Sequence, residues 1–383
     1  MRWSKSELEE KASISSLVSH PKGNKNPVLV IHGGAGLLLR KNSSPAQIEL
    51  YRDALRKALI AGNDVLQSGG QAMDAVVAAV TSMEDCPLFN SAHGAVFNVA
   101  GKNELESSIM LSHPPPSHPS VPASRKGFSL TLLTRAKNPS QMARALYLEP
   151  NLAPHAFLSG EAAETLAAKV GQELVQPSYF WTEHRWREHR RGLGLPETPF
   201  PPDAPNSGEN SPYPPLDQLP TGTVGAVALD SNGHIACCTS TGGKTNKLVG
   251  RVGDTPSMGS GFWAESWLER KRGLWAKLCR MAGKNAQTEH AVGISGTGDG
   301  DYFIREATAV SLARRMQYQR QSLKDAADGV ILDLKRAGGM GGVIALDNKG
   351  NIAMPLNSTG MYRGVIDSRG CPKVAVFDDD VLE

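Results

Sequence analysis

The chain has 383 residues, of which 40% are hydrophobic and 21% charged, and its formal net charge is +3. This near-neutral balance gives no support for nucleic-acid binding, which usually requires a basic surface. No run of about 18 apolar residues occurs, so we expect no membrane partner. The five cysteines are irregularly spaced without a CxxC pair, and they indicate neither a disulfide framework nor a zinc site.

Residues 1–26 are polar and charged and lack the apolar stretch of a secretory signal. We therefore expect a polar N-terminal extension on a cytoplasmic protein. The next run, residues 27–31, is continuously apolar, which is typical of a strand buried on both faces. Pro45 near the start of the following segment favours a helix from residue 44 to about residue 62. Further elements are predicted at residues 72–83 (helix), 128–134 (strand), 140–146 (helix) and 160–171 (helix).

Two proline-rich segments interrupt this pattern. Residues 112–126 predict a loop, with proline densest at 112–122. Residues 177–221 predict a flexible linker, because their composition cannot bury much apolar surface. The linker ends abruptly at a strand-like run.

That run opens a predicted hairpin, with strands at residues 221–230 and 235–239 joined by a Ser-Asn-Gly turn. Cys237 and Cys238 are adjacent on the second strand, so they should be buried thiols on opposite faces. A second hairpin of similar pattern is predicted at residues 342–354.

Residues 263–290 hold three tryptophans among lysines and arginines and are predicted to be helical. Basic residues interleaved with aromatics can bind nucleic acid. A solvated insertion at about 265–289 with buried tryptophans is the favoured interpretation, because the chain as a whole is nearly neutral.

The Gly222-Thr223 pair, where a strand begins directly after the linker, has the most chemical content. A threonine hydroxyl is a weak nucleophile unless a base lies beside it. Cleavage between the two residues would give Thr223 a free α-amine with an ordinary pKa of about 7.7–8.0, which could act as that base. Taken alone, the pair is more typical of an ordinary strand start, because threonine favours strands.

Residues farther along the chain favour the chemical interpretation. Thr241 ends the returning strand, which a hairpin brings close to Thr223. Arg251 and Asp254 could bind the carboxylate and the ammonium of a free amino acid, with a mutual surface ion pair as the simpler alternative. Thr297 lies in a glycine-rich turn whose N–H groups could stabilise an oxyanion.

Six stretches, in order along nearly the whole chain, carry a family resemblance. They are PVLVIHGGAG (27–36), AMDAVVAAVTSMEDCPLFNSAHGAVF (72–97), GTVGAVALDSNGHIACCTSTGG (222–243), NKLVGRVGDTP (246–256), SGTGDGDYFIR (295–305) and GGVIALDNKGNIAMPLNSTGMYRG (341–364). The sequence resembles the plant-type asparaginase/isoaspartyl peptidase family of N-terminal-nucleophile threonine hydrolases, whose relatives include glycosylasparaginase and taspase.

The resemblance implies an α/β fold, a four-layer αββα sandwich of the N-terminal-nucleophile hydrolase type. It implies self-cleavage at Gly222–Thr223 into two intertwined parts of one domain, an α-subunit half (27–222) and a β-subunit half (223–383). The processed units would form a homodimer and would require no cofactor. The substrates would be L-asparagine, β-aspartyl peptides or both, hydrolysed through a β-aspartyl ester on the enzyme.

The family's site residues carry over to matching positions. Thr223 would be the nucleophile and, through its α-amine, the base. The Thr241 hydroxyl would form a hydrogen bond with the Thr223 hydroxyl. Thr297 and the N–H of Gly298 would form the oxyanion hole. The other implied roles are those of Arg251 on the substrate α-carboxylate, Asp254 and the Gly300 carbonyl on the α-amino group, and Asn90 beside the nucleophile.

The resemblance also implies a structural Na⁺ that positions the site without taking part in the reaction. Its ligands would be the main-chain carbonyls of Met83, Glu84, Cys86, Phe89, Ser91 and His93.

The sequence departs from the family at Glu104-Leu105-Glu106, where an Asp-containing run is usual, and at 112–122, the linker and the insertion. These departures bear on substrate range, and alternatives stay open. A taspase-like endopeptidase would cut proteins after Asp and have less use for a clamp on free α-groups. Glycosylasparaginase is disfavoured because it is secreted and disulfide-bonded. A non-catalytic binding protein would have no need of the whole set of site residues.

Overall fold

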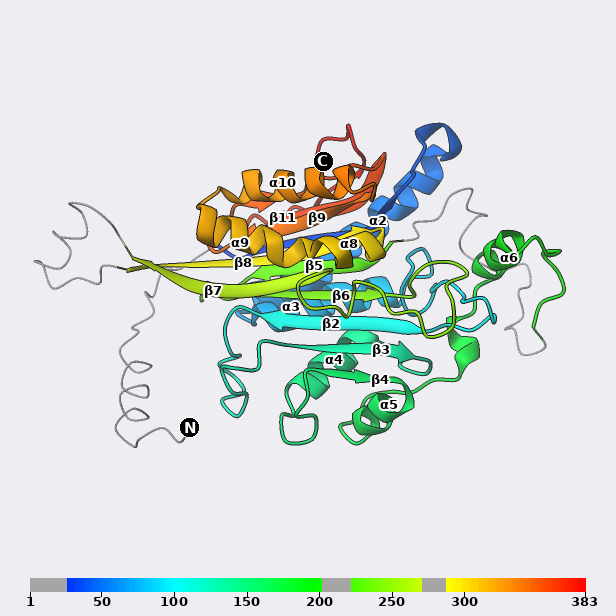
Figure 1. The fold of residues 1–383 in the computed structure, drawn as a ribbon, viewed down its shortest axis with the longest axis horizontal. Coiled ribbons are helices and arrows are strands. Elements are labelled where there is room, and N and C mark those ends of the chain that lie inside the picture. The colour runs from blue at the N-terminus through cyan, green and yellow to red at the C-terminus, as the bar shows by residue number, and fades with distance from the viewer. Residues whose placement is uncertain (1–25, 202–221, 271–286) are drawn as a thin grey trace, which may run out of the picture.

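The computed structural model describes residues 26–201, 222–270 and 287–383 (Figure 1). Its strands form two sheets in which neighbouring strands are antiparallel, except that β3 and β4 are parallel. In spatial order, the larger sheet holds β12 (Lys373–Phe377), β11 (Gly360–Asp367), β1 (Val28–Gly36), β5 (Val224–Leu229), β6 (Ile235–Thr241), β2 (Leu105–Leu111), β3 (Gly127–Leu133) and β4 (Phe157–Ser159). The smaller sheet holds β10 (Ile352–Ala353), β9 (Gly341–Asp347), β8 (Gln287–Gly298) and β7 (Phe262–Arg270).

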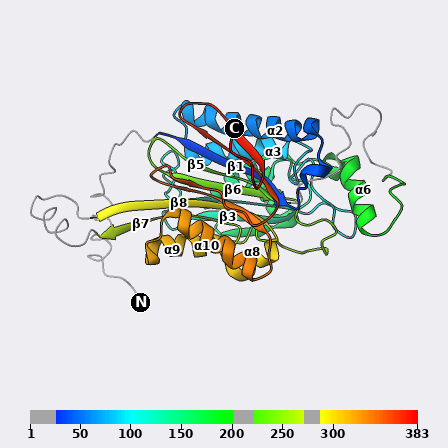
Figure 2. The ribbon, with the colours of Figure 1, turned by 90° about the horizontal axis from the view of Figure 1, so that it is seen from above.

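The helices lie on both sides of the strands, with α2 and α3 on one side and α9 and α10 on the other (Figure 2). None of the helices in the described part of the chain could cross a membrane. The helical segments are η1 (Arg40–Asn42), α2 (Pro45–Gln67), α3 (Ala72–Glu84), α4 (Pro139–Tyr147), α5 (Gly160–Ala168), η2 (Pro177–Phe180), α6 (Glu183–Gly192), α8 (Gly300–Glu306), α9 (Thr308–Gln319) and α10 (Leu323–Arg336).

Helix α2 begins where the sequence predicts, with Ser44 and Gln47 forming a capping box and Pro45 in the first turn. It continues past Gly62, which the prediction took as its end. A Cβ at Gly62 would lie 2.5 Å from a methyl carbon of Leu29 and 2.8 Å from the Ala75 carbonyl oxygen. The glycine therefore allows α2 to approach β1 and α3 closely, and it does not end the helix.

Alternating residues of the central strands face different apolar cores. In β1, Val28 and Val30 pack between the sheets, whereas Leu29 and Ile31 pack against the helices. Cys237 and Cys238 divide in the same way, one into each core. The prediction that both are buried thiols on opposite faces is confirmed.

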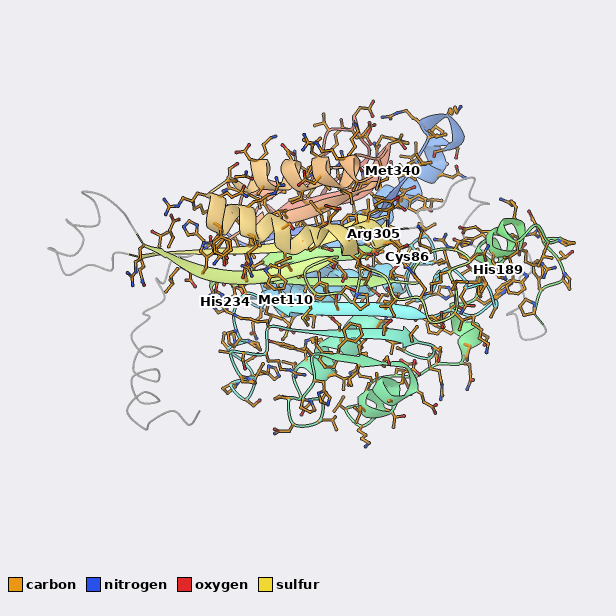
Figure 3. All side chains as sticks on the ribbon, in the orientation of Figure 1. Cys86, Met110, His189, His234, Arg305 and Met340 are labelled. Atoms are coloured by element: carbon orange, nitrogen blue, oxygen red, sulfur yellow. The ribbon has the colours of Figure 1, made fainter. Side chains whose placement is uncertain are left out.

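The predicted linker at 177–221 differs from the structure over its first part, which contains η2 and α6. Helix α6 carries His189 (Figure 3). It docks on the loop after β6, because the Asn246 side-chain amide donates to the His189 carbonyl at 3.0 Å and Oδ1 of Asn246 lies 2.5 Å from Nδ1 of His189. The average composition of the segment masked a proline-free stretch with an Arg187–Glu183 ion pair one turn apart. Residues 202–221 lie outside the described part.

The helix predicted at 263–290 is wrong where the structure describes it. Strands β7 and β8 pair from Phe262–Ser295 to Arg270–Gln287, and Trp267 stacks on His290 with ring centroids 5.6 Å apart. Aromatic side chains favour such cross-strand contacts. The insertion therefore extends a β-ribbon, and its residues 271–286 lie outside the described part.

Candidate active site

Thr223 is buried directly before β5. Val224 pairs with Ser240 in the β5–β6 ladder, so the same register puts Thr223 opposite Thr241. Side chains of opposed residues lie on the same face of a sheet. The hairpin therefore brings the two threonines together as the sequence predicts.

The hydroxyl of Thr223 is hydrogen-bonded to that of Thr255, with 2.9 Å between the oxygens. The Thr241 hydroxyl, expected in this role, instead accepts a main-chain N–H two residues further on at 3.0 Å. The Thr255 carbonyl accepts the hydroxyls of Ser108 at 2.7 Å and Thr239 at 3.2 Å, so the residue is fixed from two strands. No motif or spacing singled out Thr255 in the sequence.

His32, in the HGG run, fixes the main chain of Thr223. Its Nδ1 lies 2.8 Å from the Thr223 carbonyl oxygen and its Nε2 2.7 Å from the Ser295 hydroxyl. Because a carbonyl can only accept, Nδ1 carries the proton and Nε2 accepts from Ser295. Burial lowers the pKa of His32 to about 3, so the ring stays neutral, as this arrangement requires. His32 was not among the site residues predicted from the sequence.

Gly222 packs against β1 and β8. A Cβ there would lie 2.7 Å from the Ala35 nitrogen and 3.0 Å from the Gly34 Cα, and closer still to the Thr297 hydroxyl. The N–H of Ala35 donates to that hydroxyl at 3.2 Å. Gly298, which ends β8, has a φ of +139°, a conformation that favours glycine. Of the two predicted oxyanion residues, Thr297 therefore lies against Gly222, and Gly298 is the next residue of the chain.

Arg251 and Asp254 lie on one loop, residues 247–255, which we call the clamp loop. They form no mutual ion pair: Nη2 of Arg251 instead donates to Asp301 at 2.9 Å. Both side chains converge on Gly300, where a Cβ would collide with Asp254 Oδ1 and lie 3.2 Å from Arg251 Nη2. The three residues that were expected to hold the α-groups of a substrate are thus brought together.

The carboxyl group of Asp254 is buried, and its Oδ2 has no hydrogen-bond partner among the described residues. Burial, followed by the nearby charge of Glu106, raises the pKa of Asp254 to about 7. A buried acceptor without a partner is costly. An ammonium group bound at this point would supply both the missing hydrogen bond and the missing charge.

Asn90, in the loop after α3, is fully buried against the turn that follows Thr241. Its side-chain Nδ2 donates to the Gly243 carbonyl at 2.7 Å, and its main-chain carbonyl accepts the N–H of Gly242 at 3.1 Å. Asn90 therefore fixes the end of β6 next to the proposed nucleophile.

The same loop turns main-chain oxygens inward. A Cβ at Gly94 would lie 2.6 Å from the Phe89 carbonyl oxygen and 2.7 Å from that of Pro87. The Glu84 carbonyl accepts the N–H of His93 at 2.9 Å, which leaves one lone pair for a cation. Among the described residues, no group of three or more His, Cys, Asp or Glu side chains could hold a metal. The other expected ligands lie in or next to this loop, at Met83, Cys86 and Ser91.

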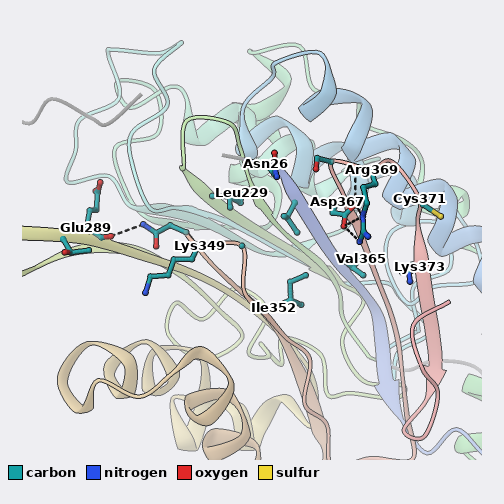
Figure 4. A pocket seen from close by; sticks show the side chains of 15 residues that line it. Asn26, Leu229, Glu289, Lys349, Ile352, Val365, Asp367, Arg369, Cys371 and Lys373 are labelled. Atoms are coloured by element: carbon teal, nitrogen blue, oxygen red, sulfur yellow. Dashed lines mark hydrogen bonds and ion pairs between the residues drawn. The ribbon is translucent and has the colours of Figure 1, made fainter. Parts of the chain in front are cut away.

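A cavity of about 800 Å³ lies at the far end of β5, where Leu229 contributes to its lining (Figure 4). Asp367 and Arg369 form an ion pair in its wall. Thr223 precedes the opposite end of the strand, about 20 Å away at 3.3 Å per residue. No residue predicted for the active site lines this cavity.

Comparison with known proteins gives one consistent result. The family model described as asparaginase matches residues 25–268 and 279–376. The isoaspartyl peptidase of Salmonella typhimurium is 37% identical over 338 residues, covering 88% of this chain and 94% of its own length. That of Escherichia coli is 36% identical, covering 88% and 91% of the two chains. An isoaspartyl peptidase/L-asparaginase of Xenopus laevis is 33% identical, covering 85% and 87%.

Proposed function

This chain belongs to the asparaginase family, and from that premise we propose that it hydrolyses L-asparagine and β-aspartyl peptides after cutting itself before Thr223. The printed names of its isoaspartyl peptidase relatives support this substrate class. One observation carries the proposal. The Thr223 hydroxyl is buried against Thr255, while the preceding residue, Gly222, packs on Thr297.

Self-cleavage would begin with attack of the Thr223 hydroxyl oxygen on the Gly222 carbonyl carbon. The Thr297 hydroxyl accepts the N–H of Ala35, so its own proton remains available for the developing oxyanion. The peptide C–N bond breaks as the nitrogen gains the hydroxyl proton, which leaves an ester. That cleavage frees the α-amine of Thr223, and water then hydrolyses the ester, producing a carboxylate on Gly222 and restoring the Thr223 hydroxyl. His32 would keep the Thr223 carbonyl in place throughout.

The new amine then serves the hydrolytic reaction. It takes the proton from the Thr223 hydroxyl, whose oxygen attacks the side-chain amide carbon of the substrate. The oxyanion would be stabilised by Thr297 and the N–H of Gly298. The C–N bond breaks, and the leaving group, ammonia or an amine, departs with the proton that the Thr223 α-amine had taken. Water then hydrolyses the β-aspartyl ester and releases aspartate.

The clamp loop would select the substrate. Arg251 would bind an α-carboxylate, and Asp254 with the Gly300 carbonyl would bind an α-ammonium. The convergence of the three residues supports this assignment. A peptide bond inside a protein chain, the substrate of an endopeptidase, has neither a free α-carboxylate nor a free α-ammonium beside it. The clamp therefore favours asparagine or a β-aspartyl dipeptide.

Three further features belong to the proposal. The two sheets, with α2 and α3 on one side and α9 and α10 on the other, would be the inner layers of an αββα sandwich. A structural Na⁺ would bind main-chain oxygens in the loop around Phe89, where the Pro87 and Phe89 carbonyl oxygens both lie within 2.7 Å of the point that a Cβ at Gly94 would take. Processed units would pair as homodimers.

An SDS gel followed over time, with N-terminal sequencing, tests self-cleavage. The expected result is conversion of the chain into two fragments, the second beginning Thr-Val-Gly-Ala-Val. Thr223→Ala should remain one band and release no ammonia from asparagine, whereas Thr223→Ser, which keeps a hydroxyl, should still process. Ammonia release by the unprocessed Thr223→Ala chain would rule out Thr223 as the nucleophile.

A further inference from the structure

Glu104, directly before β2, and Glu106, on β2, hold the clamp loop in place. Glu104 and Glu106 are two residues apart, so their side chains lie on the same face of the strand. The Glu104 carboxylate accepts the N–H of Gly250 at 3.0 Å, and Oε1 of Glu106 accepts the N–H of Gly253 at 2.9 Å. Each bonded glycine directly precedes a clamp residue. The loop is therefore fixed at two points, one beside each group proposed to bind the substrate.

Glu106 also stands in the same row of the sheet as the proposed nucleophile. It pairs directly with Thr241 in the β2–β6 ladder, and the register of β5 places Thr223 on the other side of Thr241. Opposed side chains share a face. Two strand spacings of about 4.8 Å separate Glu106 from Thr223 by about 10 Å, too far to touch the reacting atoms. Its influence on the reaction must pass through the clamp.

Two cations act on the Glu106 carboxylate, first Lys247 and then Arg251, and of these Arg251 is the one proposed to bind substrate. A Cβ at Gly253 would lie 2.7 Å from Arg251 Nη1 and 3.1 Å from Glu106 Oε2, so the two groups approach one point. Oε2 is buried and has no hydrogen-bond partner among the described residues. The other side of the guanidinium contacts Asp301, which is half exposed. Arg251 therefore lies between a buried carboxylate and a surface carboxylate.

We propose that Glu106 is a positioning residue for substrate recognition, which sets the spacing between the guanidinium of Arg251 and the carboxylate of Asp254. It does so in two ways: through its bond to the main chain before Asp254 and through its attraction for Arg251. Without its charge, Arg251 would move toward Asp301 and away from the ammonium-binding group. The inference rests on the proposed function of the clamp, and it gives the unusual Glu104-Leu105-Glu106 run a role in selecting substrates with both α-groups.

Glu106→Gln is the decisive variant, because it keeps an oxygen for the N–H of Gly253 and removes only the charge. We expect normal self-cleavage, a KM for asparagine at least tenfold higher and a kcat within about threefold of wild type. The pH at which KM begins to rise should move lower, because Asp254 loses a neighbouring negative charge and is left with Arg251 and Asp301. Glu106→Asp, which keeps the charge on a shorter side chain, should give an intermediate KM.

Glu164→Gln is the matched control. Glu164 is likewise buried and accepts main-chain N–H bonds from residues 134, 135 and 136. It belongs to α5, which packs with Leu105 in the core on the helix side of the sheet, whereas Glu106, the next residue of the strand, points to the opposite face. The Glu164→Gln change should lower the thermal midpoint without changing KM. If Glu106→Gln behaves like Glu164→Gln, Glu106 is only structural and the inference is overturned. If Glu106→Gln does not fold, the KM of Glu106→Asp decides in the same way. Failure of the wild-type enzyme to hydrolyse either asparagine or a β-aspartyl dipeptide would instead refute the proposed function. Calorimetric titration with L-aspartate would then test the clamp alone. Weaker binding of L-aspartate to Glu106→Asp than to the wild type would support the inference, and equal binding would overturn it.

Discussion

Acidification should weaken substrate binding through Asp254. Its pKa is raised to about 7 in the empty site, mainly by burial and then by Glu106, whereas an α-ammonium keeps its proton up to about pH 7.7–8.0. Between pH 5 and 7 the substrate therefore remains charged while the site loses its carboxylate. The ionised fraction falls about tenfold for each pH unit below the pKa, equivalent to about 1.4 kcal/mol per unit. KM at pH 5 should thus be about 50 times its value at pH 7, where about half of the Asp254 carboxyl groups are ionised.

Initial rates of ammonia release from asparagine, measured from pH 5 to 7.5, give KM and kcat separately. Loss of the free Thr223 amine by protonation should lower kcat over the same range. Slower chemistry brings KM closer to the dissociation constant, so the two effects can be separated. Asp254→Asn provides the control, with a high KM that does not vary with pH. A wild-type KM that stays constant from pH 7 to pH 5 would refute the assignment of Asp254 as the ammonium-binding group.

Three other experiments test separate parts of the structure. Gly222→Ala places a methyl group against the Ala35 nitrogen. The overpacking cost of about 1–3 kcal/mol should slow self-cleavage by about 5- to 150-fold on a gel time course, and an unchanged rate would contradict this packing. Arg251→Lys loses the planar fork that binds a carboxylate, so KM should rise by about tenfold or more while Arg305→Lys on α8 leaves it unchanged; equal KM values for the two variants would exclude Arg251 from the clamp. Burial raises the pKa of Cys237 to about 12, so maleimide labelling at pH 8 with peptide mapping should modify exposed Cys371 and reach Cys237 only after denaturant is added.

Local signals in the sequence predicted much of the fold. The Ser44–Pro45 start of α2 and the two faces of the Cys237–Cys238 strand follow from short-range rules on capping and strand alternation. Gly62 misled the prediction because its role depends on close approach to Leu29, which lies on another element. Strand β7 was missed for a similar reason, since its pairing with β8 depends on residues across an insertion.

The candidate site was likewise predicted where its contacts are local in the sequence and missed where they are long-range. Thr223 and Thr241 could be placed together because one hairpin carries both. His32 and Thr255 could not, because their contacts with Thr223 span 191 and 32 residues and no sequence spacing encodes them. Glu106 was noted only as a departure from a family pattern, and its bond to Gly253 became visible once the strand register was known.

The order of strands in the larger sheet has a consequence for how the processed protein would refold. Strand β1, which precedes the Gly222–Thr223 bond, lies between β11 and β5, which follow it. Strand β2, also before the bond, is hydrogen-bonded to β6, which follows it. After cleavage the sheet would be woven from two polypeptides, and its reassembly from the unfolded state would become a bimolecular reaction. Dilution would then lower the apparent stability of the processed enzyme but not that of its precursor. A single cut would therefore make a concentration-independent folding equilibrium depend on protein concentration.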